Sequence, residues 1–558
     1  MKITMKSFFM AALALMTVAC SSNDENNFAQ QPKTGEGITI TAQLAPKSGN
    51  AATRALVDKS SYIESKWAVD EHIAILYEVS GTKYAADARI TAVDGTTGAA
   101  TIEFTVNGST ADNTPCTLIY PLSAANDEHS GLKDVGTLLG TQDGTLNANL
   151  DVRMGAGTIH TTNPGLTVTT QPEAQFAIFK FTTKNAEGSA DINVKPLTIT
   201  TGAQNFVITP ASADNEFYAA LPALTSQTVN FVAKGSNGHT YSANFASITF
   251  SAGKHYQSVI KMTADNTIDL SYVTENTTAQ NGDVLTGTLG ANVKISIADN
   301  ATVTLNGVAI NGTNNSDYSW AGLTCLGSAT IILADGSTNS VKGFYSGYPG
   351  IYVPSGKTLI IKGETSGTGS LNASSNSIGA GIGGGGDKTC GNIEIQGGVI
   401  TATGGDRSAG IGSCETSSCG TITISGGTVK ATGGDLAAGI GSSIGEGGYY
   451  SSCGNISITG GTVNATGGNF AAGIGSGCGG QCSDITITSG VTSVTATRGT
   501  DDTNTYAANA VNSKHVGPGD GGTCGKVTIG GTVYWNNNDY QGDGKLYLHD
   551  NSYLTYPF

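Results

Sequence analysis

The sequence predicts an all-β protein, in which two antiparallel β-sandwich-like domains precede a right-handed parallel β-helix. Apolar and polar residues alternate with period two in short runs over residues 37–262, which is typical of strands with one buried face. From about residue 266 the chain becomes repetitive, and glycine, 78 of 558 residues, is concentrated there: residues 379–490 contain 34 of them. The predicted β domains are 37–160 and 161–265, and the β-helix is 266–558.

The composition excludes several classes of protein. Charged residues make up 13% of the chain, well below the ~25% of average proteins, which argues against a disordered polyelectrolyte or a coiled coil. The net charge is −15 and no basic stripe is present, so nucleic acid is not an expected partner. Glycine does not recur at every third position, which excludes collagen.

The first residues resemble an export signal. A positively charged start precedes the apolar stretch 8–18, which is too short to span a bilayer, and small residues lead up to Cys20. Cys20 followed by two serines resembles a bacterial lipobox, so we expect a signal peptide over 1–19 and lipidation of Cys20. The polar, acidic residues that follow predict a flexible tether over 20–36. The alternative is a plain exported protein with a free N-terminal thiol.

We expect strands throughout the region between the tether and the repeats. The sequence shows no pattern of a helix of convincing length there. The runs with the clearest alternation are separated by turn residues such as Asp94-Gly95 and Ala252-Gly253. These runs are Ile38–Leu44, Ile73–Tyr77, Phe176–Phe181, Asn230–Ala233 and Ser258–Met262.

Five motifs in this region, in order, resemble those of the fimbrillin superfamily, the pilin-like lipoproteins of gut and oral Gram-negative anaerobes. Val69 departs from the pattern, because many members have glycine before the aspartate. The motifs are Thr53-Arg54-Ala55 with Trp67, Asp70, Ile73 and Ile75; Leu118-Ile119-Tyr120-Pro121; Gln175–Phe181; Phe217–Pro222; and Phe250–Tyr256. The bland alternative for the same residues is a generic secreted β-sandwich.

The resemblance implies a transthyretin-like pilin fold and a mode of assembly. In that family a lipoprotein precursor loses its first strand by cleavage after an arginine, and the vacated groove accepts a strand of another subunit. Ile38–Leu44 matches the removable strand, and Arg54 is the only arginine between it and Trp67. Arg54 is therefore the expected site of proteolytic maturation, although it could equally be a plain loop residue.

The repeats predict the coils of a solenoid. Ala-Gly-Ile-Gly begins at Ala380, Ala409, Ala438 and Ala472. Each period contains three short apolar runs with glycine between them, which is the pattern of three strands per coil. At this period the region would form ten to twelve coils. The aromatic residues of the last thirty positions suggest a cap over the final coil, or alternatively a platform for a ligand.

Half of the ten cysteines share one position in the repeat and are expected to stack inside the solenoid. We expect them to be buried thiols, because parallel side chains would hold neighbouring Cβ atoms slightly too far apart for relaxed disulfides. Cys414 and Cys478 lie outside this register and could be free or bridged. The stacked residues are Cys390, Cys419, Cys453, Cys482 and Cys524.

A polar column precedes each Ala-Gly-Ile-Gly, formed by Ser377, Asp406, Asp435 and Asn469. Stacked carboxylates could share a cation, but solvated turns are the simpler interpretation. Other ionisable residues of the repeats are scattered over different registers, and no catalytic, phosphate-binding or metal-binding motif is found. We therefore predict no enzyme, no cofactor and no metal.

Together these features predict a structural and adhesive subunit of a cell-surface fimbrium, placed at the tip because a bulky solenoid follows the pilin-like part. Its expected partners are other fimbrial subunits, host or microbial glycans, and the outer membrane through the lipid anchor. Two alternatives remain open: a surface lipoprotein that binds glycans through the β-helix without polymerising, and a polysaccharide-cleaving β-helix enzyme.

Overall fold

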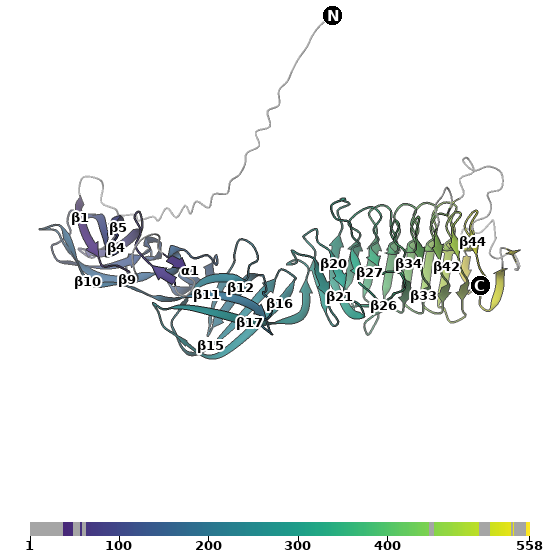
Figure 1. Cartoon of the computed structure of the whole chain (residues 1–558), viewed down its shortest axis with the longest axis horizontal. Coiled ribbons are helices and arrows are strands. Elements are labelled where there is room, and N and C mark those ends of the chain that lie inside the picture. Colours follow the sequence, from purple (N-terminus) through teal and green to yellow (C-terminus); the bar gives the residue numbers. More distant parts are fainter. Residues whose placement is uncertain are drawn as a thin grey trace, which may run out of the picture.

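The computed structural model of the chain describes residues 37–47, 56–58, 63–445, 451–500, 514–536, 539–540 and 554–557. Three β structures follow one another along the long axis of the molecule (Figure 1). The all-β prediction is confirmed, since the described helices are α1 (Val135–Leu139) and two single 3-10 turns. No described helix has the length and apolar character needed to cross a membrane.

The first structure is a seven-stranded antiparallel sheet that curves into a half-barrel, with a core of alternating inward residues. The strand predicted over Ile38–Leu44 is confirmed as β1, at one edge of this sheet, and β10 forms the other edge. The strand order is β1 (Gly37–Leu44), β6 (Ala100–Asn107), β5 (Thr82–Val93), β4 (His72–Val79), β7 (Thr114–Tyr120), β9 (Arg153–His160) and β10 (Gly165–Ala174). The sheet thus extends past residue 160, where the sequence analysis divided the β domains.

The second structure has a core rich in phenylalanine, in which Phe181 contacts both Phe179 and Phe231. Its strands are mostly antiparallel, apart from the parallel pair β11–β17. They are β11 (Phe176–Asn185), β12 (Val194–Thr201), β13 (Gln204–Ile208), β14 (Glu216–Pro222), β15 (Leu224–Gly235), β16 (His239–Phe250) and β17 (His255–Asp269).

Strand β17 continues directly into the third structure. Its 15 residues pair with β11 at one end, and Thr267–Asp269 pair in parallel with β19 (Val284–Thr288) at the other. Backbone hydrogen bonds therefore cross the predicted boundary at residue 265 without a linker. The division of the chain into domains stays a prediction.

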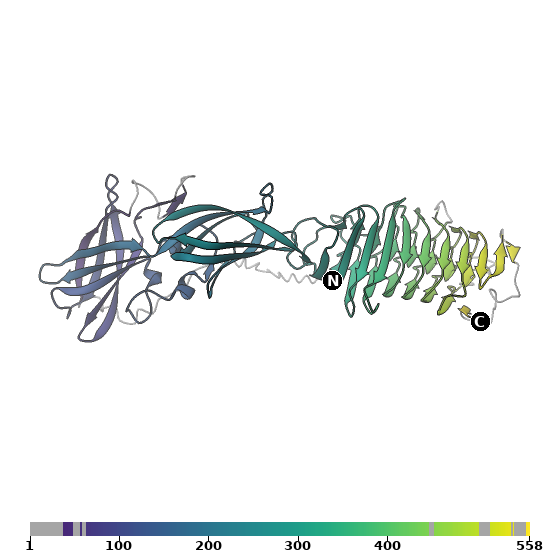
Figure 2. The same cartoon turned by 90° about the horizontal axis from the view of Figure 1, so that it is seen from below.

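The third structure is the predicted parallel β-helix, shown end to end in Figure 2. One of its sheets stacks nine strands: β18 (Thr277–Ala279), β20 (Ile295–Ile297), β22 (Leu323–Cys325), β25 (Ile351–Tyr352), β28 (Ile382–Gly383), β31 (Ile411–Gly412), β35 (Ile440–Gly441), β39 (Ile474–Gly475) and β43 (Val516–Gly517). Nine strands, counted in the described residues, is fewer than the ten to twelve coils expected.

Two further long stacks lie along the solenoid, and a shorter stack of four strands carries part of the cysteine column. One long stack contains β23 (Ala329–Leu333), β26 (Thr358–Gly363), β29 (Asn392–Ile395), β33 (Ile422–Ile424), β37 (Ile456–Ile458), β41 (Ile485–Ile487) and β45 (Val527–Ile529). The other contains β24 (Thr338–Lys342), β27 (Ser370–Ser374), β30 (Val399–Thr403), β34 (Thr428–Thr432), β38 (Thr462–Thr466) and β42 (Ser493–Thr497). The first strand of each long stack pairs with the long strand β21 (Ala301–Asn311), which itself pairs in parallel with β19.

The repeat fixes this stacking residue by residue. Ile411 lies directly over Ile440 and both are fully buried, so the same apolar position of every coil fills the interior. The end of the solenoid is antiparallel: β46 (Thr532–Asn536) folds back on β45, and β48 (Leu554–Tyr556) pairs with β42. The last coil is thus partly covered, as expected of a cap.

Candidate functional site: the groove that holds the first strand

Strand β1 lies at the edge of the first sheet and pairs, among the described strands, with β6 alone. Its side chains alternate: Ile40, Ala42 and Leu44 are buried in the core, whereas Thr39, Thr41 and Gln43 are exposed. Because the sheet curves, β1 also contacts β10 at the opposite edge. Strand β1 therefore occupies a groove between β6 and β10, at the end of the molecule where Figure 1 labels it.

Two side chains fix the backbone just beyond this strand. The indole Nε1 of Trp67 donates a hydrogen bond to the carbonyl of Ala45 at 2.9 Å. The amide of Ala45 in turn donates to Oε1 of Gln171, on β10, at 3.2 Å. The chain therefore leaves β1 in one defined position, held by Trp67 and by Gln171 of β10.

The ammonium of Lys47 then enters a buried pocket. Its Nζ lies 3.1 Å from Oδ2 of Asp151 and 3.8 Å from Oε2 of Glu71. It also lies over two aromatic rings, 3.6 Å from the centroid of Tyr120 and 4.2 Å from that of Trp67. Burial lowers the pKa of Lys47 to about 8, against an ordinary value of 10.5, although Asp151 and Glu71 act in the opposite direction.

The pocket is built from well-connected groups. Asp151 accepts hydrogen bonds from Arg153 Nε at 2.9 Å and from Ser65 Oγ at 2.5 Å. Glu71 accepts from the hydroxyl of Tyr120 at 2.7 Å and from the amide of Ala68 at 3.0 Å. Two carboxylates and one guanidinium therefore surround the ammonium among the described residues. With Lys47 protonated, the pocket contains two negative and two positive charges.

We refer to this pocket, lined by Ser65, Trp67, Glu71, Tyr120, Asp151 and Arg153, as the lysine pocket. Trp67 and Tyr120 belong to the motifs on which the family resemblance rests, but the sequence analysis did not assign Lys47 a role. A signal was present: Lys47 follows Leu44, the last inward residue of β1, by three positions.

The two site residues predicted from the sequence, Cys20 and Arg54, lie outside the described residues, as do the signal peptide and the tether. Lipidation at Cys20 and cleavage at Arg54 therefore stay predictions. The strand that Arg54 would release is the described strand β1.

In the solenoid, the polar column consists of solvated turns. Asp406, Asp435 and Asn469 are exposed, and Nδ2 of Asn469 donates to Oδ1 of Asp435 at 2.9 Å. Among the described residues, no group of three or more His, Cys, Asp and Glu side chains is placed to hold a metal ion. The column therefore shows hydrogen bonding between neighbouring coils.

The cysteine column is interior, as predicted, but the expectation that it consists of thiols is wrong. Cys390 is bonded to Cys419 and Cys482 to Cys524, whereas Cys453 between them is free and buried. Cys414 and Cys478 are buried outside the column. The Cα atoms of each bonded pair are 4.6 Å apart, within the normal range for disulfides, so the two sulfur atoms can meet although the side chains stack in parallel.

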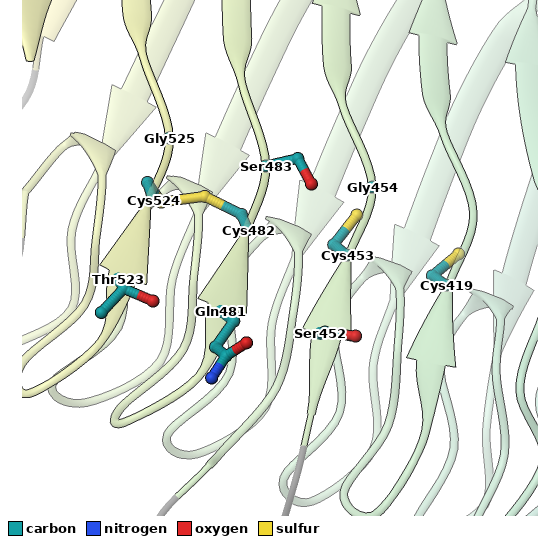
Figure 3. Close-up of a pocket in the computed structure, with 10 residues that line it drawn as sticks. All are labelled: Cys419, Ser452, Cys453, Gly454, Gln481, Cys482, Ser483, Thr523, Cys524 and Gly525. Atoms are coloured by element: carbon teal, nitrogen blue, oxygen red, sulfur yellow. A yellow bond between two sulfur atoms is a disulfide. The ribbon is translucent and has the colours of Figure 1, made fainter. Parts of the chain in front are cut away.

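Figure 3 shows four of these cysteines on successive strands, with a shallow open groove beside them. The strands are β32 (Ser418–Cys419), β36 (Ser452–Cys453), β40 (Gln481–Cys482) and β44 (Thr523–Cys524). Burial raises the pKa of the Cys453 thiol to about 12, which leaves very little reactive thiolate at neutral pH.

Comparison with known protein families gives a match within the repeat region. The model of a β-helix repeat matches residues 393–413, 422–444 and 456–478. No curated protein sequence matches the chain.

Among solved structures, a fimbrial protein from Bacteroides ovatus ATCC 8483 is similar at 10% identity over 40% of this chain and 48% of that chain, with a TM-score of 0.22. The chain thus spans about half of that protein. A fimbrial assembly protein from Parabacteroides distasonis ATCC 8503 is similar at 12% identity over 40% of this chain and 90% of that chain, with a TM-score of 0.24.

Proposed function

We propose that the chain is an adhesive subunit of a cell-surface fimbrium, joined to its neighbour by replacement of β1 with a strand of another subunit. The observation that carries this proposal is the position of β1: an edge strand, paired with β6 alone among the described strands, whose buried face fills a groove. Removal of such a strand leaves both main-chain hydrogen-bonding groups and apolar pockets for an incoming strand.

The sequence next to β1 supports a route to its removal. Cleavage after Arg54 would separate β1 from the rest of the sheet, and Cys20 would carry the precursor to the outer membrane by its acyl chains. Cleavage would also free the subunit from that anchor, since Cys20 and β1 lie on the same side of Arg54.

The C-terminal end supports a terminal position in the fimbrium. A subunit within the shaft must also donate a strand, whereas β48, the last described strand, pairs with β42 of its own solenoid. The solenoid, a long surface of exposed threonine, asparagine and serine side chains, would then be presented for adhesion, with glycans as the proposed ligands. We propose no catalytic role.

The test is to locate the protein on intact filaments with an antibody against the solenoid. Label at filament ends supports the proposal; label along the whole shaft contradicts the terminal position. Arg54→Ala and the charge-conserving Arg54→Lys should both block incorporation if an arginine-specific protease acts there. Cys20→Ala should remove acyl label and release the precursor from membranes. Protein that never associates with filaments would favour a glycan-binding lipoprotein.

A further inference from the structure

The proposed function does not explain why Lys47, which follows the replaceable strand β1, is buried among charged and aromatic side chains. Lys47 lies between β1 and Arg54, so cleavage and strand removal would take the ammonium away together with Ile40, Ala42 and Leu44. The partners of Lys47, namely Asp151, Glu71 and the two rings, belong to the part of the chain that stays.

The vacated lysine pocket would be out of electrical balance. Asp151 and Glu71 would remain with only Arg153 as a described cation within reach, and both Asp151 and Arg153 are buried. Asp151 and Glu71 attract a positive charge, although burial outweighs them in its effect on the pKa of Lys47. A buried carboxylate that loses the amine beside it is left unsatisfied, so the pocket has a chemical demand for an amine at this place. Water would meet this demand poorly, because the faces of Trp67 and Tyr120 also favour a cation.

The pocket has a fixed register relative to the groove. Trp67 and Gln171 hold the backbone of residue 45, directly after the last inward side chain of β1. Lys47 follows Leu44 by three residues, so the side chain that enters the pocket has a fixed place in the sequence of the segment. A cation at another place in an incoming strand would miss it.

We infer that the lysine pocket selects the strand that replaces β1, and that its occupant is a segment of another subunit with apolar residues at three alternating positions and a lysine three residues after the last of them. This inference rests on the proposed strand replacement and adds the chemistry of the partner. The apolar pockets accept many β sequences, whereas the charged pocket distinguishes among them and fixes their register.

The experiment uses the full chain with a sequence-specific protease site inserted beside Arg54, cut after folding. Fluorescent peptides with the sequence of residues 37–49, amidated at the C-terminus, compete with the cut segment, and anisotropy gives their affinity. The test peptide carries Lys47→Met, which keeps the length and removes the charge. A second control exchanges Pro46 and Lys47 and so moves the charge by one position. Each peptide is also measured on chain carrying Asp151→Asn or, should that variant not fold, Glu71→Gln.

We expect both altered peptides to bind about 10-fold to 100-fold more weakly than the wild-type peptide, which is the effect expected when a buried carboxylate loses the amine beside it. We expect Asp151→Asn to reduce this preference to a few-fold. Equal affinities of the lysine and methionine peptides would overturn the inference and leave strand replacement intact. Failure of every peptide, the wild-type one included, to exchange would overturn strand replacement itself and the selectivity with it.

Discussion

The ammonium of Lys47 lies 3.1 Å from Oδ2 of Asp151, and both side chains are buried. The two residues come from opposite ends of the first sheet's sequence: Lys47 follows β1, and Asp151 precedes β9. The pair therefore links the segment that we propose to be replaceable with the body of the sheet. The contribution of this pair to the free energy of unfolding depends on the charge of Lys47, so it can be measured as a function of pH.

The stability of the first sheet should rise with pH above about 8 because of Lys47. Burial lowers the pKa of this ammonium to about 8 from 10.5, so between these values the unfolded chain binds the proton and the folded chain does not. The free energy of unfolding should thus increase through this window, by a total on the order of 3 kcal/mol. Below pH 8 no change from this group is expected.

Urea unfolding followed by Trp67 fluorescence, with Trp320 and Trp535 replaced by phenylalanine, measures this effect. The control is Lys47→Met, which retains Asp151 and Glu71 but lacks the titrating group. The difference in stability between the two proteins should change between pH 8 and 10 in favour of the lysine protein. A difference that stays constant over this range would contradict the assigned burial of the ammonium.

Glycine at the end of β31 should be indispensable for the solenoid. Gly412 has φ +141°, and a Cβ there would lie 1.9 Å from the carbonyl oxygen of Gly441 on the next coil. Gly412→Ala should therefore force two coils apart, at more than about 3 kcal/mol. The matched control is Gly336→Ala, where φ is +72° but no atom lies within 4 Å of the added carbon.

The free energy of unfolding of the Gly336→Ala control should fall by only about 1–2 kcal/mol, the cost of a left-handed backbone at a residue with a Cβ. The two variants are compared by the urea midpoint of the full chain, followed by circular dichroism. Similar midpoints for both would show that positive φ alone, and not the close stacking of coils, requires glycine at position 412.

The sequence predicted those features that depend on local pattern or on repetition. Alternation identified β1, and the 29-residue repeat placed Ile411 over Ile440, because identical coils must stack in register. The lysine pocket could not be found this way: Lys47 and Asp151 are brought together by the curvature of the sheet. Periodicity carries no information about contacts between unlike segments.

The cysteine column shows a second limit. Neighbouring members are equivalent in sequence, so spacing alone cannot say which of them bond. Five cysteines cannot all pair within the column, so at least one must remain a thiol. In the structure that residue is Cys453. The choice depends on side-chain rotation and backbone separation, which a repeat pattern does not encode.

Mass spectrometry should therefore find two disulfides and one thiol in this column. After alkylation in denaturant without reductant, peptides should be linked as Cys390–Cys419 and Cys482–Cys524, and Cys453 should carry the alkyl group. Without denaturant Cys453 should react slowly, because it is buried and its thiol has a pKa of about 12.

Cys453→Ser is the control, since both links should persist in it. Oxidising conditions, as in exported proteins, are required for the links to form. A link that includes Cys453 in the wild-type protein, or rapid alkylation of all five cysteines in the folded state, would contradict this arrangement.

The alternation of β1 predicts opposite outcomes for two neighbouring substitutions. Ile40 is fully buried and Thr41 is exposed, although both pair with β6. Ile40→Ala should lower the free energy of unfolding by about 2–4 kcal/mol, through lost burial and the cavity left behind. Thr41→Ala should change it by less than about 0.5 kcal/mol.

In chain cut beside Arg54, the same difference should appear in the rate at which the segment that contains β1 is released. Release should be faster by roughly 30-fold or more for Ile40→Ala than for Thr41→Ala, since ~1.4 kcal/mol corresponds to tenfold. Equal release from both variants would mean that the buried face of β1 does not hold the strand in its groove, and the strand could then not be the plug that another subunit replaces.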